Sequence, residues 1–474
     1  MVQQSSGSVA VLDAELTAAL SDIVGEEHLL TGDRISADYG HDEALSVGAV
    51  TPAVVVRPAS AAEVVGVLRV AVAHRLPVTA RGSGTGLSGG AVPLSGGLVL
   101  SCERMNAVLE VDTENHVAVV QPGVTLTELD EAVAEHGLVY PVYPGELSGS
   151  LGGNVATNAG GMRAVRYGVT RNQVLGLQAA LPSGELIRTG GKLVKSSTGY
   201  DLTQLIIGSE GTLGVVTEVT LRLYPRPPHQ ATVLAPYGTV DEVAAAVPKV
   251  VASGVGPLVR EYLDAFTMAA ITHAQQLELG ISAEIKEKAQ AYLLVMLEST
   301  HADRLEADVE RLGELLTDLG ATEVYVLPGP SARRLVEARE KTFWTAKAAG
   351  ANDIVDVVVP RASIPEFLRV TRSLAEKHGS HVLGCGHAGD GNVHLAVFQT
   401  DDEVRAALLR ELFEAGMKLG GLISGEHGIG RCKQDHFLAL TDPVTVGLMR
   451  RIKQAFDPTG ILNPGVLLDE GVQE

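Results

Sequence analysis

Hydrophobic and polar residues follow two different periods along the chain, and their mixture predicts an α+β protein. Apolar residues recur at helical spacing in residues 13–24, and again after Ser60 and Thr125, which have Glu63 and Glu128 three positions later as in a capping box. Short apolar runs rich in β-branched residues predict strands between these helices, at residues 54–56, 78–80, 117–120 and 215–223. Long helices are few before residue 225, and small-residue loops separate the strands.

A different pattern begins after residues 224–228, YPRPP, where three prolines interrupt helix and strand alike. Strand-like runs at 291–297, 322–328 and 354–360 alternate here with helical runs at 240–251, 302–319 and 363–378. This alternation predicts an antiparallel sheet with helices on one face. Two more helices are expected towards the C-terminus, at 402–419 and 442–456.

One stretch of this second part, GCGHAGDGNVH at residues 384–394, has the sequence of a β-hairpin. Asp390 and Gly391 form a dipeptide that is favoured in two-residue type I′ turns. A two-residue loop would pair His387 with His394, with Cβ atoms roughly 4.5–5.5 Å apart, which suits two ligands of one metal ion. From this stretch alone, a metal site and a pair of ordinary loop histidines both remain open.

A glycine-rich loop follows the predicted strand at 78–80 and begins at Arg81. Gly84, Gly86 and Gly89 match the pattern G-x-G-x-x-G, but a nicotinamide-dinucleotide site needs a helix to open there, and the following GGAVPLSGG with Pro93 cannot form one. We therefore reject that cofactor. The loop is instead suited to wrapping a pyrophosphate with its backbone N–H groups.

A second segment rich in glycine and asparagine, at residues 144–174, also permits close approach of the backbone to a ligand. Together the two segments predict a bulky, flat, phosphate-bearing cofactor laid across residues 50–225, rather than a phosphate ion alone.

Charge and cysteine content restrict the partners. The 37 basic and 57 acidic residues give a formal net charge of −20, which argues against nucleic acid and against an anionic lipid surface. Three scattered cysteines are too few for a disulfide framework, so a reducing compartment is expected. Without a positively charged leader or a run of 18 apolar residues, we expect a cytoplasmic protein, with peripheral membrane attachment and a homodimer left open.

Seven motifs follow one another along the chain: RGSGTGLSGG, GSLGGNVATNAGG, STGYDL, GSEGTLGVVTEVTLRL, GHAGDGNVH, SGEHGIG and DPTGILNPG. In this order they closely resemble the FAD-linked D-2-hydroxy-acid dehydrogenases, which include D-lactate dehydrogenase, the glycolate oxidase flavoprotein subunit and D-2-hydroxyglutarate dehydrogenase, within the vanillyl-alcohol-oxidase flavoprotein superfamily. The resemblance covers residues 40–466. It implies a two-subdomain FAD-binding domain at 1–225, an α+β substrate domain with an antiparallel sheet at 226–420, and a segment at 421–474 that returns to the flavin side and completes the active site.

The resemblance also implies the residues that contact FAD. They are Arg81, Gly82, Gly84, Thr85, Gly86 and Ser88 in the first loop, Pro144, Ser148, Gly152, Asn154, Asn158 and Gly161 in the second segment, and Glu210, Gly211, Val216 and Asn463 further on. Relatives that attach FAD covalently often use a histidine or cysteine in the pyrophosphate loop, and residues 83–88 contain neither. Noncovalent FAD is therefore expected.

The same resemblance implies a divalent metal, commonly zinc, with His387, His394 and Glu426 as ligands. Three protein ligands leave a position open for substrate. His427 matches the general base that takes the proton of a metal-bound hydroxyl while hydride passes from C2 to the flavin.

A substrate carboxylate needs an anchor, and the resemblance implies Arg339, with Lys347 and Arg361 as less favoured alternatives. In D-2-hydroxyglutarate dehydrogenases, a lysine and an asparagine hold a second carboxylate. This chain has no lysine at the matching place near Ile354, and it has Ala396 in place of the asparagine. These departures favour D-lactate or glycolate as substrate. We assign no function to Cys385 or to the sequence RCK at 431–433.

Several alternatives remain: a D-2-hydroxyglutarate dehydrogenase, another flavoenzyme of the superfamily such as an alkyl-glycerone-phosphate synthase, a metal-dependent hydrolase, and a noncatalytic flavin subunit of an electron-transfer complex. The expected electron acceptor is a quinone, a cytochrome or an electron-transfer flavoprotein, among which the sequence does not choose.

Overall fold

The first sheet forms where the sequence predicts a strand–helix–strand unit. In the computed structural model, which describes residues 13–469, its strands lie in the order β1 (Leu29–Thr31), β2 (Val54–Val56), β4 (Leu98–Ser101) and β3 (Val78–Arg81). Strands β2, β4 and β3 are parallel, and β1 is antiparallel to β2. Helices α1 (Ala14–Val24) and α2 (Ala61–Ala73) share its core through Leu20, Val64 and Leu68, which confirms both predicted helices.

A five-stranded antiparallel sheet forms from strands between residues 108 and 222. Its order is β5 (Val108–Asp112), β6 (Val117–Val120), β10 (Val215–Arg222), β8 (Val174–Ala180) and β9 (Leu186–Gly190). The accompanying elements are α3 (Leu126–Ala134), α4 (Leu151–Thr157), the short helices α5 (Ala164–Tyr167), α6 (Thr170–Gln173) and α7 (Leu202–Ile206), and a ribbon of β7 (Leu138–Val139) and β11 (Tyr224–Pro225).

The two predicted capping boxes differ in the structure. Thr125 and Glu128 form a complete box at the start of α3. Ser60 accepts the N–H of Glu63, but the Glu63 carboxylate accepts the N–H of Ala59 instead of that of Ser60, so the box at α2 is only half formed.

The predicted antiparallel sheet of the second part has seven strands. Their order is β15 (Tyr325–Leu327), β12 (His229–Tyr237), β14 (Ala291–Ser299), β13 (Val259–Asp264), β17 (His381–His387), β18 (Asn392–Phe398) and β16 (Asp353–Val358). Helices α8 (Val240–Ala252), α11 (Ala302–Asp318), α14 (Ile364–Lys377) and α15 (Asp402–Lys418) share one core with it.

The expectation of helices on one face only was wrong. A second core contains residues of α9 (Ala265–Ala274) and α12 (Gly329–Glu340), and the short helices α10 (Ala283–Lys288) and α13 (Thr342–Ala348) belong to the same side. The reason is visible in β14, where Leu293 and Val295 lie in the first core and Tyr292 and Leu294 in the second. A strand that is apolar on both faces must be covered on both.

The predicted register of the histidine hairpin was also wrong. His387 pairs with Asn392, and His394 pairs with Cys385, so the loop has four residues, 388–391, instead of two. The backbone turns directly after His387, whose carbonyl accepts the N–H groups of both residues 390 and 391. His394 nevertheless lies on the same face as His387, since it is two residues beyond its partner, and the ring centroids are 4.8 Å apart.

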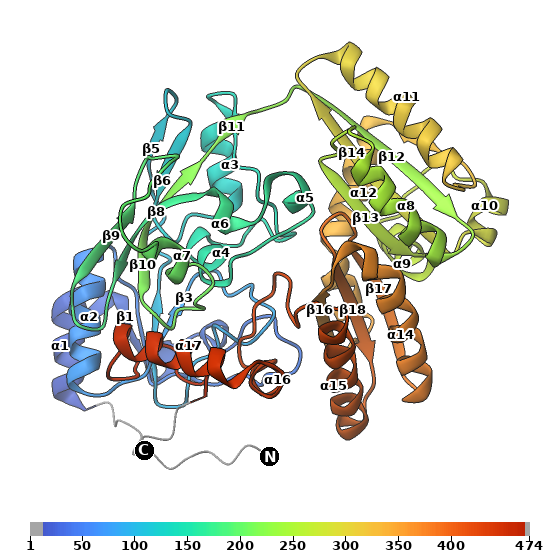
Figure 1. The fold of residues 1–474 in the computed structure, drawn as a ribbon. Helices are drawn as coiled ribbons and strands as arrows, with labels where there is room; N and C mark the ends of the chain where they lie inside the picture. Colours follow the sequence, from blue (N-terminus) through green and yellow to red (C-terminus); the bar gives the residue numbers. More distant parts are fainter. Residues whose placement is uncertain (1–12, 470–474) are drawn as a thin grey trace.

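As expected, the C-terminal segment returns to the four-stranded and five-stranded sheets of the first part of the chain. Helices α16 (Gln434–Leu440) and α17 (Pro443–Phe456), in red, lie under these sheets in Figure 1. The N–H of Asn463 donates to the carbonyl of Val78 in β3 (2.8 Å), and Lys453 Nζ donates to the carbonyls of Thr212 (2.9 Å) and Leu462 (2.8 Å).

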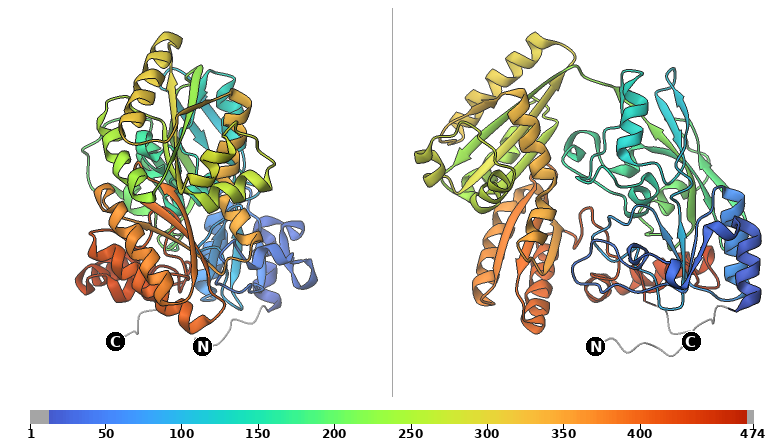
Figure 2. Two further views of the ribbon diagram at one scale, coloured as in Figure 1. Left: turned by 90° about the vertical axis from the view of Figure 1, so that its right-hand side faces the viewer. Right: turned by 180° about the vertical axis from the view of Figure 1, so that it is seen from behind.

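The seven-stranded sheet stands beside the first two sheets. The chain passes from one part to the other between β11 and β12 and again after α15 (Figure 2). The division into domains at residues 1–225, 226–420 and 421–474 stays a prediction. None of the helices within residues 13–469 has the length and apolarity to cross a membrane.

Candidate active site

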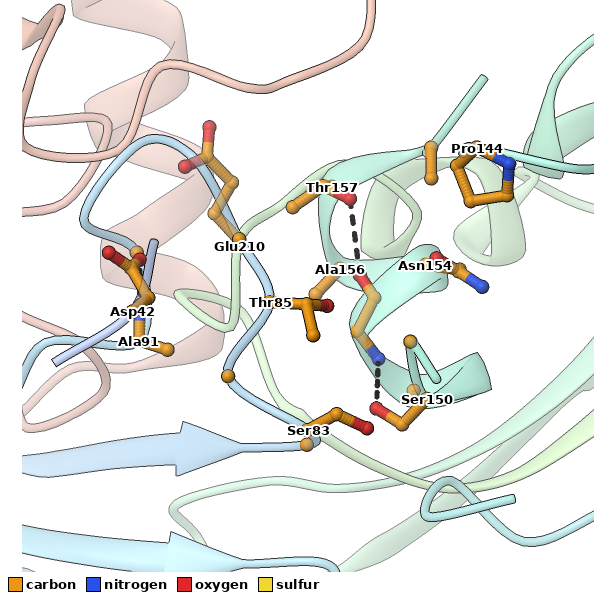
Figure 3. Close-up of a pocket in the computed structure, with 18 of the residues that line it drawn as sticks. Asp42, Ser83, Thr85, Ala91, Pro144, Ser150, Asn154, Ala156, Thr157 and Glu210 are labelled. Carbon is orange, nitrogen blue, oxygen red and sulfur yellow. Dashed lines mark hydrogen bonds between the residues drawn. The ribbon is translucent and has the colours of Figure 1, made fainter. Parts of the chain in front are cut away.

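The loop after β3 wraps one side of a large cavity. No helix opens between residues 82 and 97, which agrees with the rejection of a nicotinamide-dinucleotide site. Gly84 has a positive φ of 74°, and a Cβ atom there would overlap the Arg81 guanidinium. A Cβ atom on Gly82 would overlap the hydroxyl of Ser150, the N-cap of α4. Glycine at position 82 therefore allows the loop to lie against α4, and glycine at position 84 leaves room for the Arg81 side chain. Figure 3 shows the loop beside α4.

Polar groups in this cavity are free to bind a ligand. Among the described residues, none accepts a hydrogen bond from the backbone N–H groups of residues 83–88. The side-chain nitrogen of Asn154, in α4, is buried against the cavity and also has no partner within residues 13–469. A row of backbone donors and an amide donor fit a long anionic ligand such as a dinucleotide.

Most of the sequence-predicted FAD residues line this cavity. They are Arg81, Gly82, Gly84, Thr85, Gly86, Ser88, Pro144, Gly152, Asn154, Glu210, Gly211 and Val216. The other four do not: Ser148 is exposed and bonds to Glu146, Asn158 ends α4, Gly161 lines a second cavity, and Asn463 is buried behind the loop. Ser150 lines the cavity and was not predicted, although a serine before a short helix is a recognisable cap.

Hydrogen bonds of Glu210 and Asn463 connect the glycine loop, the segment of Glu210 and the C-terminal loop beside the cavity. The Glu210 carboxylate accepts the N–H groups of Ile429 (2.8 Å) and Gly430 (2.7 Å). The Asn463 amide donates to the carbonyls of Gly90 and Glu210, both at 2.8 Å. These bonds hold the C-terminal loop against the glycine loop.

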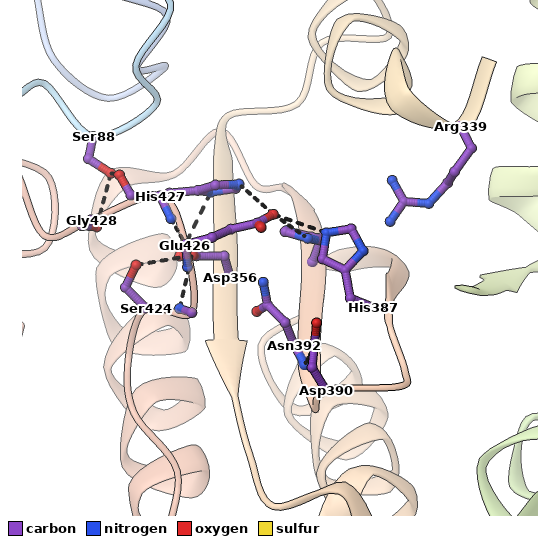
Figure 4. A network of polar contacts seen from close by, with 12 residues as sticks. Ser88, Arg339, Asp356, His387, Asp390, Asn392, Ser424, Glu426, His427 and Gly428 are labelled. Atoms are coloured by element: carbon purple, nitrogen blue, oxygen red, sulfur yellow. Dashed lines mark hydrogen bonds and ion pairs between the residues drawn. The ribbon is translucent and has the colours of Figure 1, made fainter. Parts of the chain in front are cut away.

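The three predicted metal ligands come together. His387 Nε2 and His394 Nε2 each lie 3.1 Å from Glu426 Oε1, and one ligand atom from each residue lies within 4.8 Å of the others. Figure 4 shows Glu426 directed at His387. Burial disfavours a charge on His387, but Glu261 and Glu426 outweigh it and raise the His387 pKa well above its usual value.

A carboxylate that the sequence analysis missed orients this cluster from behind. Glu261 in β13 pairs in register with His387, and its Oε1 lies 2.7 Å from His387 Nδ1. This contact leaves the Nε2 atom of His387 directed at Glu426. The sequence gives little sign of this role, because Glu261 is one of three charged residues in the strand VREYLD and its partner is 126 residues away.

Arg339 lies beside the same carboxylate, with Nη2 2.5 Å from Glu261 Oε2. The side chain is buried, and within residues 13–469 its Nε has no hydrogen-bond partner. Lys347, a less favoured anchor, forms an ion pair with Glu43 (2.5 Å), and Arg361 lies outside the lining of both cavities.

The backbone of His427 is fixed on both sides. Its N–H donates to Asp356 Oδ2 (2.9 Å), and its carbonyl accepts the hydroxyl of Ser88 (3.0 Å). The ring stacks on His394, with centroids 5.1 Å apart. Burial lowers the pKa of His427 to about 4, although Asp356 opposes this shift.

Asp356 in β16 organises the whole loop. It accepts the hydroxyl of Ser424 (3.0 Å) and the N–H groups of Gly425 (3.1 Å), Glu426 (2.9 Å) and His427 (2.9 Å), and it forms an ion pair with Lys433. Burial opposes its charge, but His427 and Lys433 keep its pKa below the usual range. In the sequence, these two residues are the aspartate of the apolar run IVDVVVP and the lysine of RCK. The sequence analysis assigned no role to either.

A second cavity adjoins the first. Its polar end contains Arg339, His387, His394, Glu426 and His427, and Glu426 and His427 line both cavities. The titratable cluster therefore lies where the glycine-loop cavity meets a smaller one.

Comparison with known proteins agrees with this architecture. A family model described as FAD binding domain matches residues 52–190, and one described as FAD linked oxidases, C-terminal domain, matches residues 226–467. Such a pair of domains defines a flavin-dependent oxidoreductase. The chain belongs to the FAD-linked oxidase family, which confirms the resemblance seen in its motifs and leaves the hydrolase alternative without support.

Relatives cover nearly the whole chain. An uncharacterised FAD-linked oxidoreductase of Mycobacterium tuberculosis is 60% identical over 96% of this chain and 100% of that one. A D-lactate dehydrogenase of Anaerostipes hadrus is 37% identical over 93% of this chain and 95% of its own length. The solved structure of p-cresol methylhydroxylase shares the fold, with a TM-score of 0.79 and 18% identity over 96% of each chain.

Proposed function

We propose that this protein oxidises a D-2-hydroxy monocarboxylic acid, with D-lactate and glycolate as the first candidates, to the 2-oxo acid. It would use noncovalent FAD and a divalent metal at His387, His394 and Glu426, a ligand set that suits zinc. The observation that carries the proposal is that Glu426 and His427 line both cavities. A substrate in the smaller cavity can therefore meet metal, base and flavin together.

The side chains present fit both groups. Two imidazole nitrogens and one carboxylate oxygen within 4.8 Å form a three-ligand set that leaves a position open. When bound, FAD supplies a two-electron acceptor, and the metal supplies a Lewis acid that lowers the pKa of a coordinated hydroxyl.

The chain's own residues have separate tasks. His427 accepts the proton of the substrate hydroxyl, while its backbone bonds to Asp356 and Ser88 hold the ring in place. Arg339 binds the substrate carboxylate through its unpartnered Nε, a buried donor for which a charged acceptor is a suitable partner. As the C2 hydride leaves with both electrons of its bond, C2 and the deprotonated oxygen become the carbonyl of the product.

Anaerobic flavin reduction tests this function. D-lactate, glycolate and D-2-hydroxyglutarate are each added to the purified holoenzyme, with L-lactate as the stereochemical control. Bleaching of the flavin by D-lactate or glycolate, and not by L-lactate, supports the proposal, whereas bleaching by D-2-hydroxyglutarate alone favours the dicarboxylate alternative. A flavoprotein that no 2-hydroxy acid bleaches contradicts it and favours another flavoenzyme of the superfamily.

The glycine loop gives a prediction about FAD. Gly84→Ala places a Cβ atom at a φ of 74° and against the Arg81 guanidinium. Because left-handed backbone costs an L-residue about 1–2 kcal/mol, we expect FAD affinity to fall roughly 5–30-fold. Flavin content of the purified protein, measured against total protein, checks this. Gly48→Ala is the control, since Gly48 is exposed with open space around it, and equal flavin loss in both variants would contradict the prediction.

Glu261 gives a prediction about the metal. Glu261→Gln keeps the shape of the side chain but removes the charge beside His387 Nδ1. Such partners are typically worth about 10–100-fold in metal affinity, so zinc should be lost at correspondingly lower chelator concentration. Competition with a chromophoric chelator measures it. Glu298→Gln is the control, because Glu298 is a buried strand glutamate that bonds to Tyr167 outside the cluster; an unchanged zinc affinity in Glu261→Gln would refute the role of Glu261.

A further inference from the structure

The far end of the second cavity is apolar. We call it the apolar chamber and define it by six lining residues, Ile354, Leu383, Ala396 and Phe398 from the sheet and Ile271 and Ala346 from α9 and α13. The four sheet residues are only half-buried, whereas Val355 and Val397, their neighbours on the opposite face, are 0% exposed. The chamber is thus apolar surface that the fold leaves accessible from within the active site.

Strand register places this chamber directly beyond the metal cluster. Along β18, His394 is followed on the same face by Ala396, one step of about 6.6–6.8 Å. Ala396 pairs with Ile354 on one side and with Leu383 on the other. The sheet face therefore changes from titratable to wholly apolar within a single step.

Among residues 13–469, none of the six that define the chamber can pair with a second charge. The titratable side chains that line the second cavity are Arg339, Glu340, His387, His394, Glu426 and His427, and none of them belongs to the chamber. Two of the hydroxyls that line the second cavity are already engaged, because Thr267 donates to the carbonyl of Gly384 (3.3 Å) and Thr345 to that of Lys341 (3.4 Å). A carboxylate placed there would lose its hydration without a replacement bond.

We infer that the chamber receives the side chain on C2 of the substrate, and that the favoured substrates are D-2-hydroxy acids with an apolar side chain of roughly three to five carbons, the length of one strand step. This inference rests on the proposed function and extends it, since D-lactate carries one side-chain carbon and glycolate none. It also separates this protein from enzymes that hold a dicarboxylate.

A series of substrates tests the inference on the holoenzyme. The kcat/KM is measured with an artificial electron acceptor for glycolate, D-lactate, D-2-hydroxybutyrate, D-2-hydroxyvalerate and D-2-hydroxyhexanoate. We expect a rise of roughly fourfold for each methylene, the factor that corresponds to burying one CH2 group. D-2-hydroxyglutarate, with the same five carbons as D-2-hydroxyvalerate, should be at least about tenfold poorer than it.

The outcomes separate the two proposals. If these acids reduce the flavin but kcat/KM falls from D-lactate upwards, or if D-2-hydroxyglutarate equals D-2-hydroxyvalerate, the inference is wrong and the proposed function stands. If none of the acids reduces the flavin, the proposed function itself is wrong.

Two matched variants of α13 locate the side-chain site. Ala346→Phe adds a ring at a residue that lines the chamber. Ala348→Phe adds the same ring at an exposed position of α13 that does not line the second cavity. The ratio of kcat/KM for D-2-hydroxyhexanoate to that for glycolate should fall at least about tenfold in Ala346→Phe and stay unchanged in Ala348→Phe, given the usual cost of overpacking. Equal ratios in the two variants would overturn the inference.

Binding of products gives a readout without turnover. Pyruvate and 2-oxohexanoate are titrated into the oxidised holoenzyme, and the perturbation of the flavin spectrum reports their Kd. We expect 2-oxohexanoate to bind more tightly than pyruvate, with the difference reduced in Ala346→Phe. Tighter binding of pyruvate would overturn the assignment of the chamber.

Discussion

Replacing His427 with asparagine should lower kcat for the best D-2-hydroxy acid by about 10²–10⁴-fold, the range typical of removing a general base. The ring of His427 lies in the lining shared by both cavities and is stacked on His394, so no other described imidazole occupies the same place. Asparagine keeps a polar side chain and leaves the backbone bonds to Asp356 and Ser88 available. Stopped-flow measurement of anaerobic flavin reduction isolates this step from later electron transfer.

The control is His436→Asn, in the same C-terminal segment. His436 packs against Phe413, with ring centroids 4.9 Å apart, and lines neither cavity. Its variant should retain the rate of flavin reduction to within about twofold, because the His436 side chain lies outside both cavities. If His427→Asn also retains the rate, His427 is not the base, and another group must take the proton of the substrate hydroxyl.

The strongly periodic elements could be predicted from sequence to within one or two residues. The expected helices at 240–251, 302–319 and 363–378 are α8, α11 and α14, because amphipathic spacing marks them clearly. Helix α9 was missed: its sequence AFTMAAITHA is apolar on nearly every side, so it has little periodicity to detect. This omission explains why helices on the second face of the large sheet, which also line part of the second cavity, were not expected.

The hairpin shows where a local rule fails. The dipeptide Asp390-Gly391 favours a two-residue turn, yet the chain turns from His387 onwards and the loop has four residues. The two histidines still lie together because a shift by two residues in a strand preserves the face, whereas a shift by one would have separated them. The candidate ligands are therefore grouped although the predicted register was wrong.

The residues that hold the candidate ligands and base in place were the least predictable. Glu261 and Asp356 each contact the candidate ligands or base across more than 35 residues of sequence, from strands whose pairing the sequence does not specify. Motif resemblance points to groups that touch ligands, whereas a carboxylate inside an apolar strand is the physical sign of a partner. Buried charge is costly unless paired, so the aspartate of IVDVVVP implied a buried contact before its partner could be named. VREYLD has three charged residues out of six and gave no comparable sign.

Replacing Glu426 with glutamine should remove the metal and lower kcat by about 10²–10³-fold, because a Lewis acid at the reacting oxygen is worth several kcal/mol. Glu426 Oε1 is 3.1 Å from Nε2 of both His387 and His394, so it is the group that joins the two imidazoles into one site. A neutral amide is a weaker ligand for a divalent cation than a carboxylate. Metal content by mass spectrometry and flavin content by absorbance, measured on the same sample, separate loss of metal from loss of FAD.

The matched control for Glu426 is Glu411→Gln, because Glu411 also contacts a histidine, His378, at 3.2 Å, but on the surface of the second part. It should keep both metal and rate. In wild type, dialysis against a chelator should reproduce the loss of activity, and zinc should restore it, while Glu426→Gln should stay inactive after zinc is added. Full activity of the stripped wild-type enzyme would contradict a role for the metal. His387, His394 and Glu426 would then act as a hydrogen-bonded cluster, in which Glu261 and Glu426 raise the pKa of His387.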